Sequence, residues 1–303
     1  MKPIVYVIAG PTASGKSNLA VELAKRINGE IISADSMQIY KDMNIGTAKI
    51  TKNEMQGIPH YMLDIISPNE RYSVSSYKKQ AEEIIEEIIS KGKTPIIAGG
   101  TGLYIDSLIY GIEFQDEEID TAYREELNSL AEKEGLKKLY EQAKKIDPQA
   151  MEKISENDKK RIIRVLEIYH KTGKTKTEQE IESRKNEVKY NYKVFAINFD
   201  REKLYSRIEL RVDKMMSQGL VEEVKEILQK YSEFPTAMQG LGYKEVVEFL
   251  NNKITEEEMI EKIKKETRHY AKRQLTWFRK NKETIWLDGE EEIDKNIEIM
   301  INN

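Results

Sequence analysis

Residues Gly10–Ser17 read GPTASGKS, and this stretch decides the fold. It follows Ile4–Ala9, an apolar and β-branched run that predicts a buried strand, and it precedes leucines and alanines at helical spacing. The string matches G-x-x-x-x-G-K-[ST], the phosphate-binding loop (P-loop) that joins a strand to a helix. Its glycines let backbone N–H groups turn toward phosphate oxygens, and Lys16 adds a positive charge. The sequence therefore predicts a polyphosphate or diphosphate site, with the Ser17 hydroxyl as a ligand for Mg²⁺.

Further strands are expected later in the chain. Short apolar runs at Glu30–Ala34 and Thr94–Ala98 enclose an amphipathic helix, whose apolar stripe includes Tyr77, Ala81, Ile84, Ile85, Ile88 and Ile89. Strands at Lys193–Phe199 and Thr284–Leu287 follow later in the chain. Alternating strands and helices favour a parallel sheet. The predicted fold class is α/β: a P-loop NTPase-like parallel sheet with helices on both faces and an all-helical insert domain.

The domain organisation follows from where the strand pattern stops. No convincing strand occurs between about Glu113 and Tyr192, where charged helical segments predominate. We therefore expect a P-loop core in two parts, residues 1–112 and 193–303, interrupted by a helical insert at 113–192. The final dozen residues are expected to be loosely held, as chain ends often are.

Composition restricts the class of protein. Of 303 residues, 39% are hydrophobic and 34% charged, and no apolar run is long enough to span a membrane. Cysteine is absent, which excludes disulfides and thiolate metal sites, and the three histidines are too scattered for a zinc site. Without a secretory signal pattern at the start, we expect a cytoplasmic protein. No self-complementary surface can be recognised, which favours a monomer.

The net charge of −4 does not by itself indicate a nucleic-acid binder. Two basic clusters nevertheless stand out, and their members are Lys159, Lys160, Arg161 and Arg164 in one and Arg268, Lys272, Arg273, Arg279, Lys280 and Lys282 in the other. Each is either a solvated helix face or an RNA contact. Aromatic residues Tyr270, Trp277 and Phe278 lie within the second cluster, and packing against the core is the favoured interpretation for them.

The residues around the loop argue against an ordinary nucleotide hydrolase. The N-K-x-D element of guanine-specific switch proteins does not occur, and the strand Thr94–Ala98 ends in two glycines without an acidic residue. The strand Glu30–Ala34 instead ends at Asp35, and Thr101 follows the third strand. Because ligands bind at the carboxyl ends of parallel strands, both side chains should lie beside the P-loop. Asp35 is then either a turn or helix cap, or a general base for an incoming nucleophile.

Two arginines also suit a diphosphate. Arg207 and Arg211 are four residues apart and therefore share one helix face. They form either a solvated, ion-paired face or a clamp whose guanidinium groups match phosphate oxygens.

Taken together, these motifs resemble those of the bacterial tRNA dimethylallyltransferases, also called tRNA isopentenyltransferases. The resemblance runs in order over nearly the whole chain, and the matching stretches are GPTASGKS (10–17), DSMQIYKDMNIGTAK (35–49), PHYMLDI (59–65), GGTGLY (99–104), NDKKRIIRVLEI (157–168), TGK (172–174), GLGYKE (240–245) and AKRQLTWFR (271–279).

The resemblance implies transfer of a dimethylallyl group from its diphosphate to the N6 amino group of the adenosine 3′ of the anticodon in tRNA. It makes Asp35 the general base, Thr101 an assistant at the transferring carbon or bridging oxygen, and Arg211 the diphosphate arginine, with Arg207 second. The diphosphate and Mg²⁺ would be held by the P-loop residues Gly10, Thr12, Ala13, Ser14, Gly15, Lys16 and Ser17.

The resemblance also implies contacts with the anticodon stem-loop of tRNA. They would come from Thr101 and from Asp35, Ser36, Met37 and Gln38 in the core, and from Arg124, Lys160, Arg161, Ile162, Ile163 and Arg164 in the insert. The segment Gln239–Lys244 departs from some relatives, which carry an extra arginine there, so a contact from it stays open.

Three alternatives remain at this point. A P-loop kinase of a small metabolite would use ATP, and an isopentenyltransferase acting on free AMP would share the core chemistry. A non-catalytic nucleotide-binding module would bind tRNA and leave the prenyl diphosphate intact. The helical insert, with its basic segment, favours tRNA as the acceptor.

Overall fold

The computed structural model describes residues 2–114, 120–183 and 187–303, and the chain divides into two compact units. The core domain comprises the residues up to Ile109 together with Lys189–Asn303. The insert comprises Tyr110–Val188. The expected insert extended to residue 192, whereas a strand of the core sheet already begins at Asn191.

The core domain is built on one six-stranded sheet in the order β3-β2-β4-β1-β5-β6, in which every paired strand is parallel. The strand bounds are β1 Ile4–Ala9, β2 Gly29–Ser33, β3 His60–Tyr61, β4 Thr94–Gly99, β5 Asn191–Asn198 and β6 Ile285–Asp288. The predicted α/β fold class is confirmed. The two-residue strand β3 was not predicted, because it has no pattern of its own and forms only by pairing with Ile31 and Ile32.

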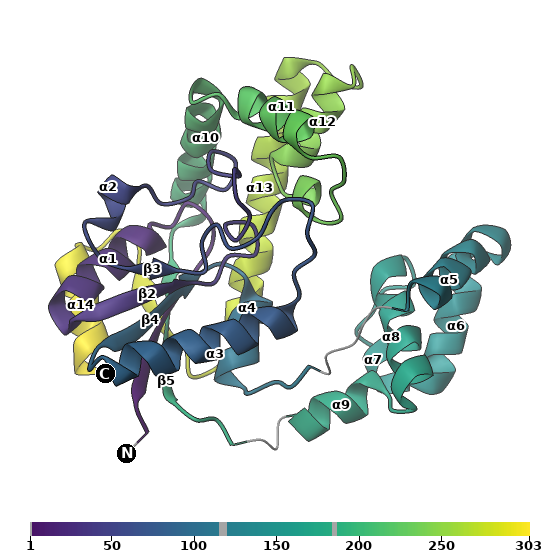
Figure 1. Cartoon of the computed structure of the whole chain (residues 1–303), viewed down its shortest axis with the longest axis horizontal. Coiled ribbons are helices and arrows are strands. Elements are labelled where there is room, and N and C mark those ends of the chain that lie inside the picture. Colours follow the sequence, from purple (N-terminus) through teal and green to yellow (C-terminus); the bar gives the residue numbers. More distant parts are fainter. Residues whose placement is uncertain (1, 115–119, 184–186) are drawn as a thin grey trace. The chain divides into compact units, whose positions relative to one another are not determined.

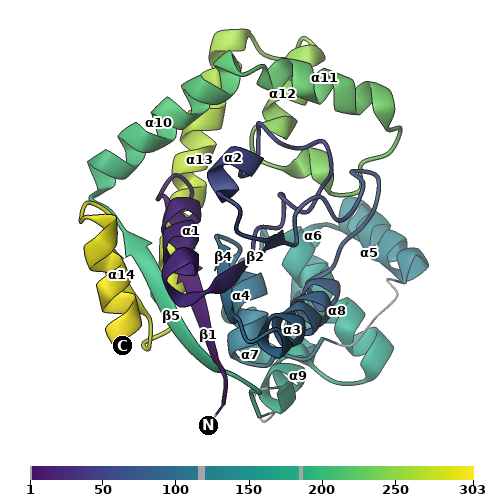
Figure 2. The same ribbon diagram turned by 60° about the vertical axis from the view of Figure 1, so that its left-hand side comes forward.

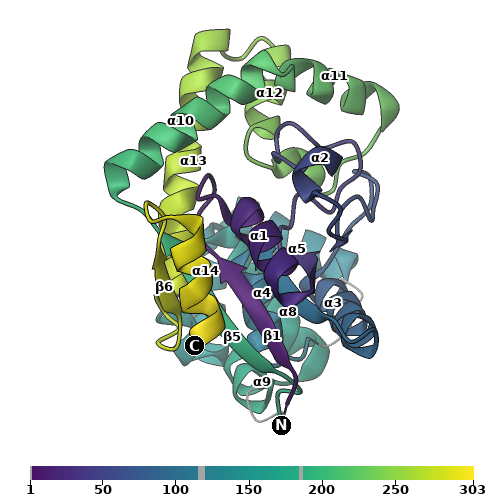
Figure 3. The same ribbon diagram turned by 90° about the vertical axis from the view of Figure 1, so that its left-hand side faces the viewer.

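Helices cover both faces of the sheet (Figure 1). The helices α1 (Lys16–Ile27), α10 (Arg201–Ser217) and α14 (Ile293–Asn302) contribute to the apolar cluster on one face, and Figure 3 shows α1 and α14 in front of β1 and β5. The helices α3 (Val74–Ser90) and α4 (Gly102–Ile109) pack on the other face. The expectation of a loosely held C-terminus is wrong, since Ile297 and Met300 of α14 are fully buried.

A third apolar cluster lies beyond the sheet and involves the long segment after β2. Helices α11 (Leu220–Lys230), α12 (Tyr243–Leu250) and α13 (Glu256–Phe278), with the 3-10 turn Ala237–Gln239, pack against Ile39, Tyr40 and Met43. Figure 2 shows this segment, with its short helix α2 (Lys52–Met55), below α10, α11 and α12. The arrangement folds the residues after Asp35 back over the sheet edge where the P-loop lies.

Within its described residues the insert is entirely helical. Its helices are α5 Thr121–Glu134, α6 Leu136–Ile146, α7 Pro148–Met151, α8 Lys159–Thr172 and α9 Lys176–Ser183. They enclose a small apolar cluster that includes Leu127, Leu139 and Leu166. The buried carboxylate of Asp147 caps α7 and also accepts hydrogen bonds from the backbone and hydroxyl of Thr177, at 2.9 and 2.6 Å, which ties α9 to α7.

None of the helices in the part of the chain that the structure describes has both the length and the apolar character needed to cross a bilayer.

Candidate active site

The P-loop turns directly from β1 into α1. Gly15 lies just before the helix with φ 87°, and Ala13 also has a positive φ of 64°. A left-handed conformation is costly for a residue with a β-carbon, so Ala13 is held there by its surroundings. The cap residue of α1, Gly15, has no side chain with which to cap the helix. The first N–H groups of the helix are therefore available to an anion, which the positive end of the helix dipole favours.

Two side chains of the loop are suited to binding an anion. The Ser14 hydroxyl is buried and has no hydrogen-bond partner among the described residues. A buried hydroxyl without a partner is costly, and a bound phosphate oxygen would satisfy it. Lys16 donates from Nζ to the carbonyl of Pro11 at 2.7 Å, so its ammonium group is folded over the loop.

Three charged groups from separate elements influence one another at this edge of the sheet. Burial, and then the nearby Arg211, lower the pKa of Lys16 from 10.5 to about 7, while Asp35 opposes this shift. Burial also lowers the pKa of Arg211, again opposed by Asp35. A carboxylate that affects both cations must lie near the P-loop, as the strand order leads us to expect.

Asp35 is oriented by the backbone that follows it. Its Oδ1 accepts hydrogen bonds from the N–H groups of Met37 at 2.9 Å and Gln38 at 3.4 Å. The capping role considered for Asp35 is therefore present. Capping uses Oδ1 and leaves Oδ2 of Asp35 available to act as a general base, so the capping role and the catalytic role are compatible.

Thr101 joins the loops that follow β2 and β4. Its Oγ1 accepts from the N–H of Ser36 at 2.9 Å and lies 3.3 Å from the Ser36 hydroxyl, and its own N–H donates to the carbonyl of Ala34 at 3.0 Å. This approach requires glycine at position 99, because a β-carbon there would lie 2.2 Å from the Ala34 carbonyl oxygen.

The two arginines of α10 differ in their environment. Arg207 is exposed, donates from Nε to the carbonyl of Ala13 at 2.8 Å, and stacks over Phe199 at 4.8 Å. Arg211 is more buried and donates from Nη2 to the carbonyl of Thr47 at 3.1 Å. Arg207 thus supports the backbone of the P-loop, whereas Arg211 is the one within electrostatic reach of Lys16 and Asp35.

Sequence reasoning missed Gln274 of α13 and considered Tyr270 only for packing or RNA stacking. Gln274 is buried; its Oε1 accepts from the N–H of Thr12 and its Nε2 donates to the carbonyl of Gly100, both at 2.8 Å. Burial, and then Asp35, raise the pKa of Tyr270, one turn before Gln274 on the same helix. The available signal was a glutamine on the apolar face of a helix, between Ala271 and Phe278, which are both buried.

The other aromatic residues of this cluster serve packing, as favoured. Phe278 belongs to the apolar cluster on one sheet face. Trp277 packs where a β-carbon at Gly102 would otherwise be, and its Nε1 donates to Asp106 at 2.9 Å.

The basic segment of the insert presents some of its predicted contact residues and buries others. Lys160, Arg161 and Arg164 are exposed on α8. Ile162 and Ile163 are 0% and 5% exposed and belong to the apolar cluster of the insert. The prediction that these two isoleucines contact RNA is thereby corrected for their side chains, because the helical period turns them inward.

Arg124 is engaged within the insert. Its guanidinium forms a two-pronged ion pair with the buried carboxylate of Glu167, with Nη2 2.8 Å from Oε2. Arg164 reaches the same carboxylate at 3.8 Å. An RNA contact from Arg124 would use the edge of the guanidinium that faces away from Glu167.

The segment Gln239–Lys244 has a structural role. The Tyr243 hydroxyl donates to the buried carboxylate of Glu223 at 2.7 Å, and that carboxylate also accepts from the N–H groups of Asn44, Ile45 and Gly46. Next to it, Glu245 caps α12 by accepting from the N–H of Gly242 at 2.9 Å.

A metal ion at this site would depend on few protein ligands. Among the described residues no group of three or more histidine, cysteine or acidic side chains lies close enough together to hold one. The exposed hydroxyl of Ser17 at the start of α1 suits a hard cation that takes its remaining ligands from a diphosphate and water.

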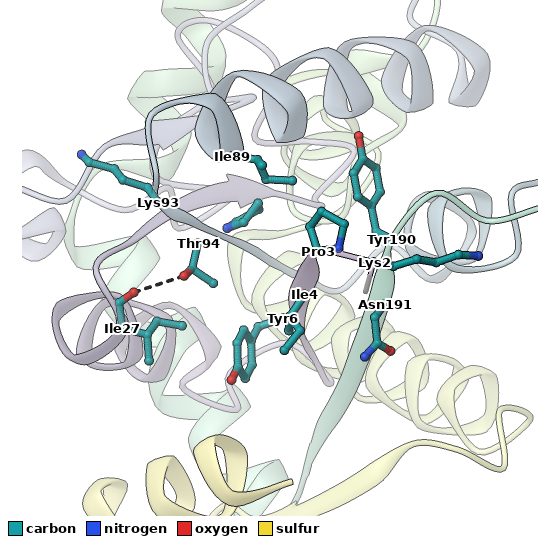
Figure 4. A pocket seen from close by; sticks show the side chains of 11 residues that line it. Lys2, Pro3, Ile4, Tyr6, Ile27, Ile89, Lys93, Thr94, Tyr190 and Asn191 are labelled. Carbon is teal, nitrogen blue, oxygen red and sulfur yellow. Dashed lines mark hydrogen bonds between the residues drawn. The ribbon is translucent and has the colours of Figure 1, made fainter.

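The cavity of about 900 Å³ in Figure 4 lies at the opposite edge of the sheet. Its lining includes Pro3 and Ile4 at the start of β1 and Thr94 at the start of β4, far along the strands from the P-loop. Ligands of parallel sheets bind at the carboxyl ends of the strands, so we assign the chemistry to the P-loop edge.

Comparison with known proteins shows the family of this chain. The family model described as IPP transferase matches residues 38–281. The chain is 53% identical to the tRNA dimethylallyltransferase of Caldanaerobacter subterraneus subsp. tengcongensis, over 91% of this chain and 88% of that one. It is 50% identical to the protein of the same name from Acetivibrio thermocellus, over 97% and 96% of the two chains.

Solved structures are similar over the whole length. The tRNA isopentenylpyrophosphate transferase of Bacillus halodurans superimposes with a TM-score of 0.74 at 40% identity, covering 100% of this chain and 95% of that one. A eukaryotic dimethylallyltransferase solved acting on tRNA gives a TM-score of 0.80 at 33% identity, covering 95% of this chain and 74% of that one. This protein belongs to the IPP transferase family.

Proposed function

We propose that this protein is a tRNA dimethylallyltransferase, which transfers a dimethylallyl group from dimethylallyl diphosphate to N6 of the adenosine 3′ of the anticodon. The observation that carries the proposal is the meeting of Lys16, Arg211 and Asp35 beside a phosphate loop with an uncapped helix start. The relatives named tRNA dimethylallyltransferase, and the related enzyme solved acting on tRNA, support the choice of substrates.

The donor end of the site neutralises charge on the leaving diphosphate. As the bond between the allylic carbon and the diphosphate oxygen breaks, negative charge grows on that oxygen and positive charge spreads over the allylic group. Lys16, Arg211 and the free N–H groups at the start of α1 stabilise that negative charge and are in place before the reaction. The Ser14 hydroxyl, which has no partner among the described residues, donates to one phosphate oxygen. Gly10, Thr12, Ala13 and Gly15 shape the loop, and Arg207 braces it through the carbonyl of Ala13.

Mg²⁺ is the cation we propose at Ser17. When bound, it adds positive charge next to the diphosphate oxygens. The protein contributes the hydroxyl at the start of α1, and its own cations Lys16 and Arg211 supply the rest of the charge.

The acceptor end of the site activates a weak nucleophile. The adenine amino nitrogen attacks the allylic carbon, the carbon–oxygen bond breaks, and the amino proton passes to Asp35. Thr101, tied to Ser36 beside Asp35, assists at the transferring carbon or the bridging oxygen. The adenosine must leave the stack of its loop to reach these groups.

The insert contacts the phosphate backbone of the tRNA. Asp35–Gln38 and Thr101 contact the tRNA from the core domain. Lys160, Arg161 and Arg164 are exposed for phosphate contacts, and Arg124 adds its outer edge. Because its substrate is tRNA, we expect the enzyme to act in the cytoplasm. We also expect a monomer, because no self-complementary surface can be recognised in the sequence.

One experiment separates this activity from its rivals. Purified protein with Mg²⁺, dimethylallyl diphosphate and unmodified tRNA should yield N6-dimethylallyladenosine, detected by nucleoside mass spectrometry at the position 3′ of the anticodon. Parallel reactions contain AMP in place of tRNA, or labelled ATP with candidate small acceptors. Transfer to AMP alone, phosphoryl transfer from ATP, or tRNA binding without consumption of the prenyl diphosphate would each replace the proposal with the corresponding alternative.

A further inference from the structure

Gln274 connects two loops that are far apart in the sequence, the P-loop and the loop after β4. Its side-chain carbonyl accepts from the N–H of Thr12 in the P-loop, and its amide nitrogen donates to the carbonyl of Gly100 after β4. Both hydrogen bonds are 2.8 Å long, and the side chain is only 6% exposed. A buried amide with both ends satisfied is oriented in one way, because reversing it would set like groups against each other.

The two loops belong to opposite halves of the proposed reaction. Thr12 lies in the loop that would hold the diphosphate donor. Gly100 precedes Thr101, whose hydroxyl is bonded to the backbone of Ser36 next to the proposed base Asp35. A single side chain therefore spans from the donor loop to the acceptor loop through Gly100, Thr101 and Ser36.

The side chain of Gln274 packs closely against the backbone of Gly100. A β-carbon at position 100 would lie 2.2 Å from Nε2 of Gln274. The helix that carries Gln274 is itself anchored, because Trp277 donates to Asp106 and Phe278 is buried against the sheet. α13 thus presents a rigid polar edge to both loops.

We propose that Gln274 is a positioning residue that holds the donor loop and the acceptor loop at the separation needed for attack. The inference rests on the proposed transferase function. Transfer requires the amine nitrogen and the allylic carbon to approach within ~3–3.5 Å, and a displacement of ~1 Å is enough to lower the rate by ~10²-fold. Gln274 contacts neither substrate in this role, and it acts through Thr12 and Gly100.

Two substitutions of similar size test the proposal. Gln274→Met removes both hydrogen bonds, and we expect kcat to fall ~10- to 100-fold, with the dissociation constant for tRNA within about twofold of the wild type. Gln274→Glu keeps an acceptor for Thr12 but, when ionised, turns an oxygen toward the Gly100 carbonyl. When protonated, its carboxyl has one donor and one acceptor, as the amide does. The kcat of Gln274→Glu relative to the wild type should therefore rise as the pH falls, while that of Gln274→Met stays flat.

Thr276→Ala is the matched control, because Thr276 is exposed on the same helix and its hydroxyl donates to the carbonyl of Lys272, within that helix. It should retain the wild-type kcat. If the wild type transfers no prenyl group, the proposed function itself fails. If the wild type is active and Gln274→Met retains kcat within about twofold, the bridge is not a positioning device. A reduced kcat in Gln274→Glu with the same pH profile as the wild type also overturns the proposal, since a merely structural defect has no reason to reverse on protonation.

Discussion

Asp35 has one carboxylate oxygen committed to the backbone of Met37 and Gln38, and this constrains how it can be tested. Asp35→Asn keeps an oxygen acceptor for those N–H groups and removes the negative charge and the basicity. We expect kcat to fall ~10²-fold or more, the usual scale of general base catalysis, with tRNA affinity nearly unchanged. Single-turnover kinetics and a filter-binding assay on the same preparations measure the two quantities. An equal loss of tRNA affinity would make Asp35 an anchor for the RNA instead of the base.

Lys16 makes both stability and donor binding depend on pH. In the folded chain burial, and then Arg211, hold the pKa of Lys16 at about 7, below the ordinary value of 10.5. Between these two values the unfolded chain retains a proton at Lys16 that the folded chain has released, so this residue makes stability rise with pH across the window. A bound diphosphate favours the charged ammonium and restores the proton, so donor affinity should fall as the pH rises above about 7.

Calorimetry at pH 8 checks this expectation. Titrations of dimethylallyl diphosphate in two buffers of different ionisation enthalpy should show uptake of up to about one proton per site in the wild type, and Lys16→Met should remove this uptake. Equal proton uptake in both proteins would assign the titration to another group and leave Lys16 charged in the empty enzyme.

At the scale of elements, the segment after Asp35 depends on one carboxylate of α11. Glu223 accepts from three successive backbone N–H groups, Asn44 to Gly46, and from the Tyr243 hydroxyl. The next residue, Thr47, offers its carbonyl to Arg211 and to the side chain of Gln38. Glu223 therefore supports two groups of the site without approaching it.

Glu223→Gln should destabilise the protein, because an NH₂ group would replace an oxygen that faces only donors. We expect the free energy of unfolding to fall by about 1–3 kcal/mol, the cost of a buried polar group left unsatisfied. Urea denaturation followed by circular dichroism measures it. Glu222→Gln is the control, since the Glu222 side chain is 67% exposed on the same helix and its nearest partner, Lys225, is 3.7 Å away. A similar effect of both substitutions would mean that the charge of α11, and not this hydrogen-bonding arrangement, matters.

At the scale of the whole molecule, the division into two units separates the chemistry from much of the RNA binding we propose. The core domain contains the P-loop, Asp35, Thr101 and Arg211, and the insert contains the exposed basic side chains of α8. The net charge of −4 hides this distribution, because local clusters and not the sum attract a phosphate backbone.

The double variant Lys160→Glu and Arg161→Glu should weaken tRNA binding and lower the slope of log affinity against log salt by roughly one for each phosphate that the protein no longer neutralises. Donor affinity, measured by calorimetry without tRNA, should stay at the wild-type value. Lys144→Glu and Lys145→Glu, both exposed on α6, form the control with the same change of charge in the same unit. If the two double variants weaken binding equally, α8 has no special part in holding the RNA.

Local pattern was sufficient for the centre of the sheet and for the loop beside it. Ile4–Ala9 is a strand with the predicted bounds, because it is apolar throughout and its end is marked by Gly10 and Pro11. Asp35 was placed near the P-loop from the sequence because parallel strands bring their carboxyl ends to one edge. These features depend on short-range signals and on a general rule of topology, both of which can be read along the chain.

Other features depend on what a side chain meets after folding. The helical period predicts that Arg207 and Arg211 lie on the same face. The packing of α10 decides that Arg207 is exposed and that Arg211 is half-buried near Asp35. The apolar spacing of α8 agrees with the inward orientation of Ile162 and Ile163, whereas the RNA contact expected of them followed from the resemblance to a family and not from this spacing.

By itself the sequence determined the phosphate loop, the parallel sheet and the family, and it supplied the residues that we propose carry the reaction. Tertiary structure alone decided that Gln274, more than 250 residues after Thr12, binds it, and that two residues at His60–Tyr61 become a strand. The physical reason is that such contacts join segments that are far apart in the sequence, and the local sequence of each segment carries no signal for the contact. The contact stabilises the protein only after the rest of the fold has brought the two partners together.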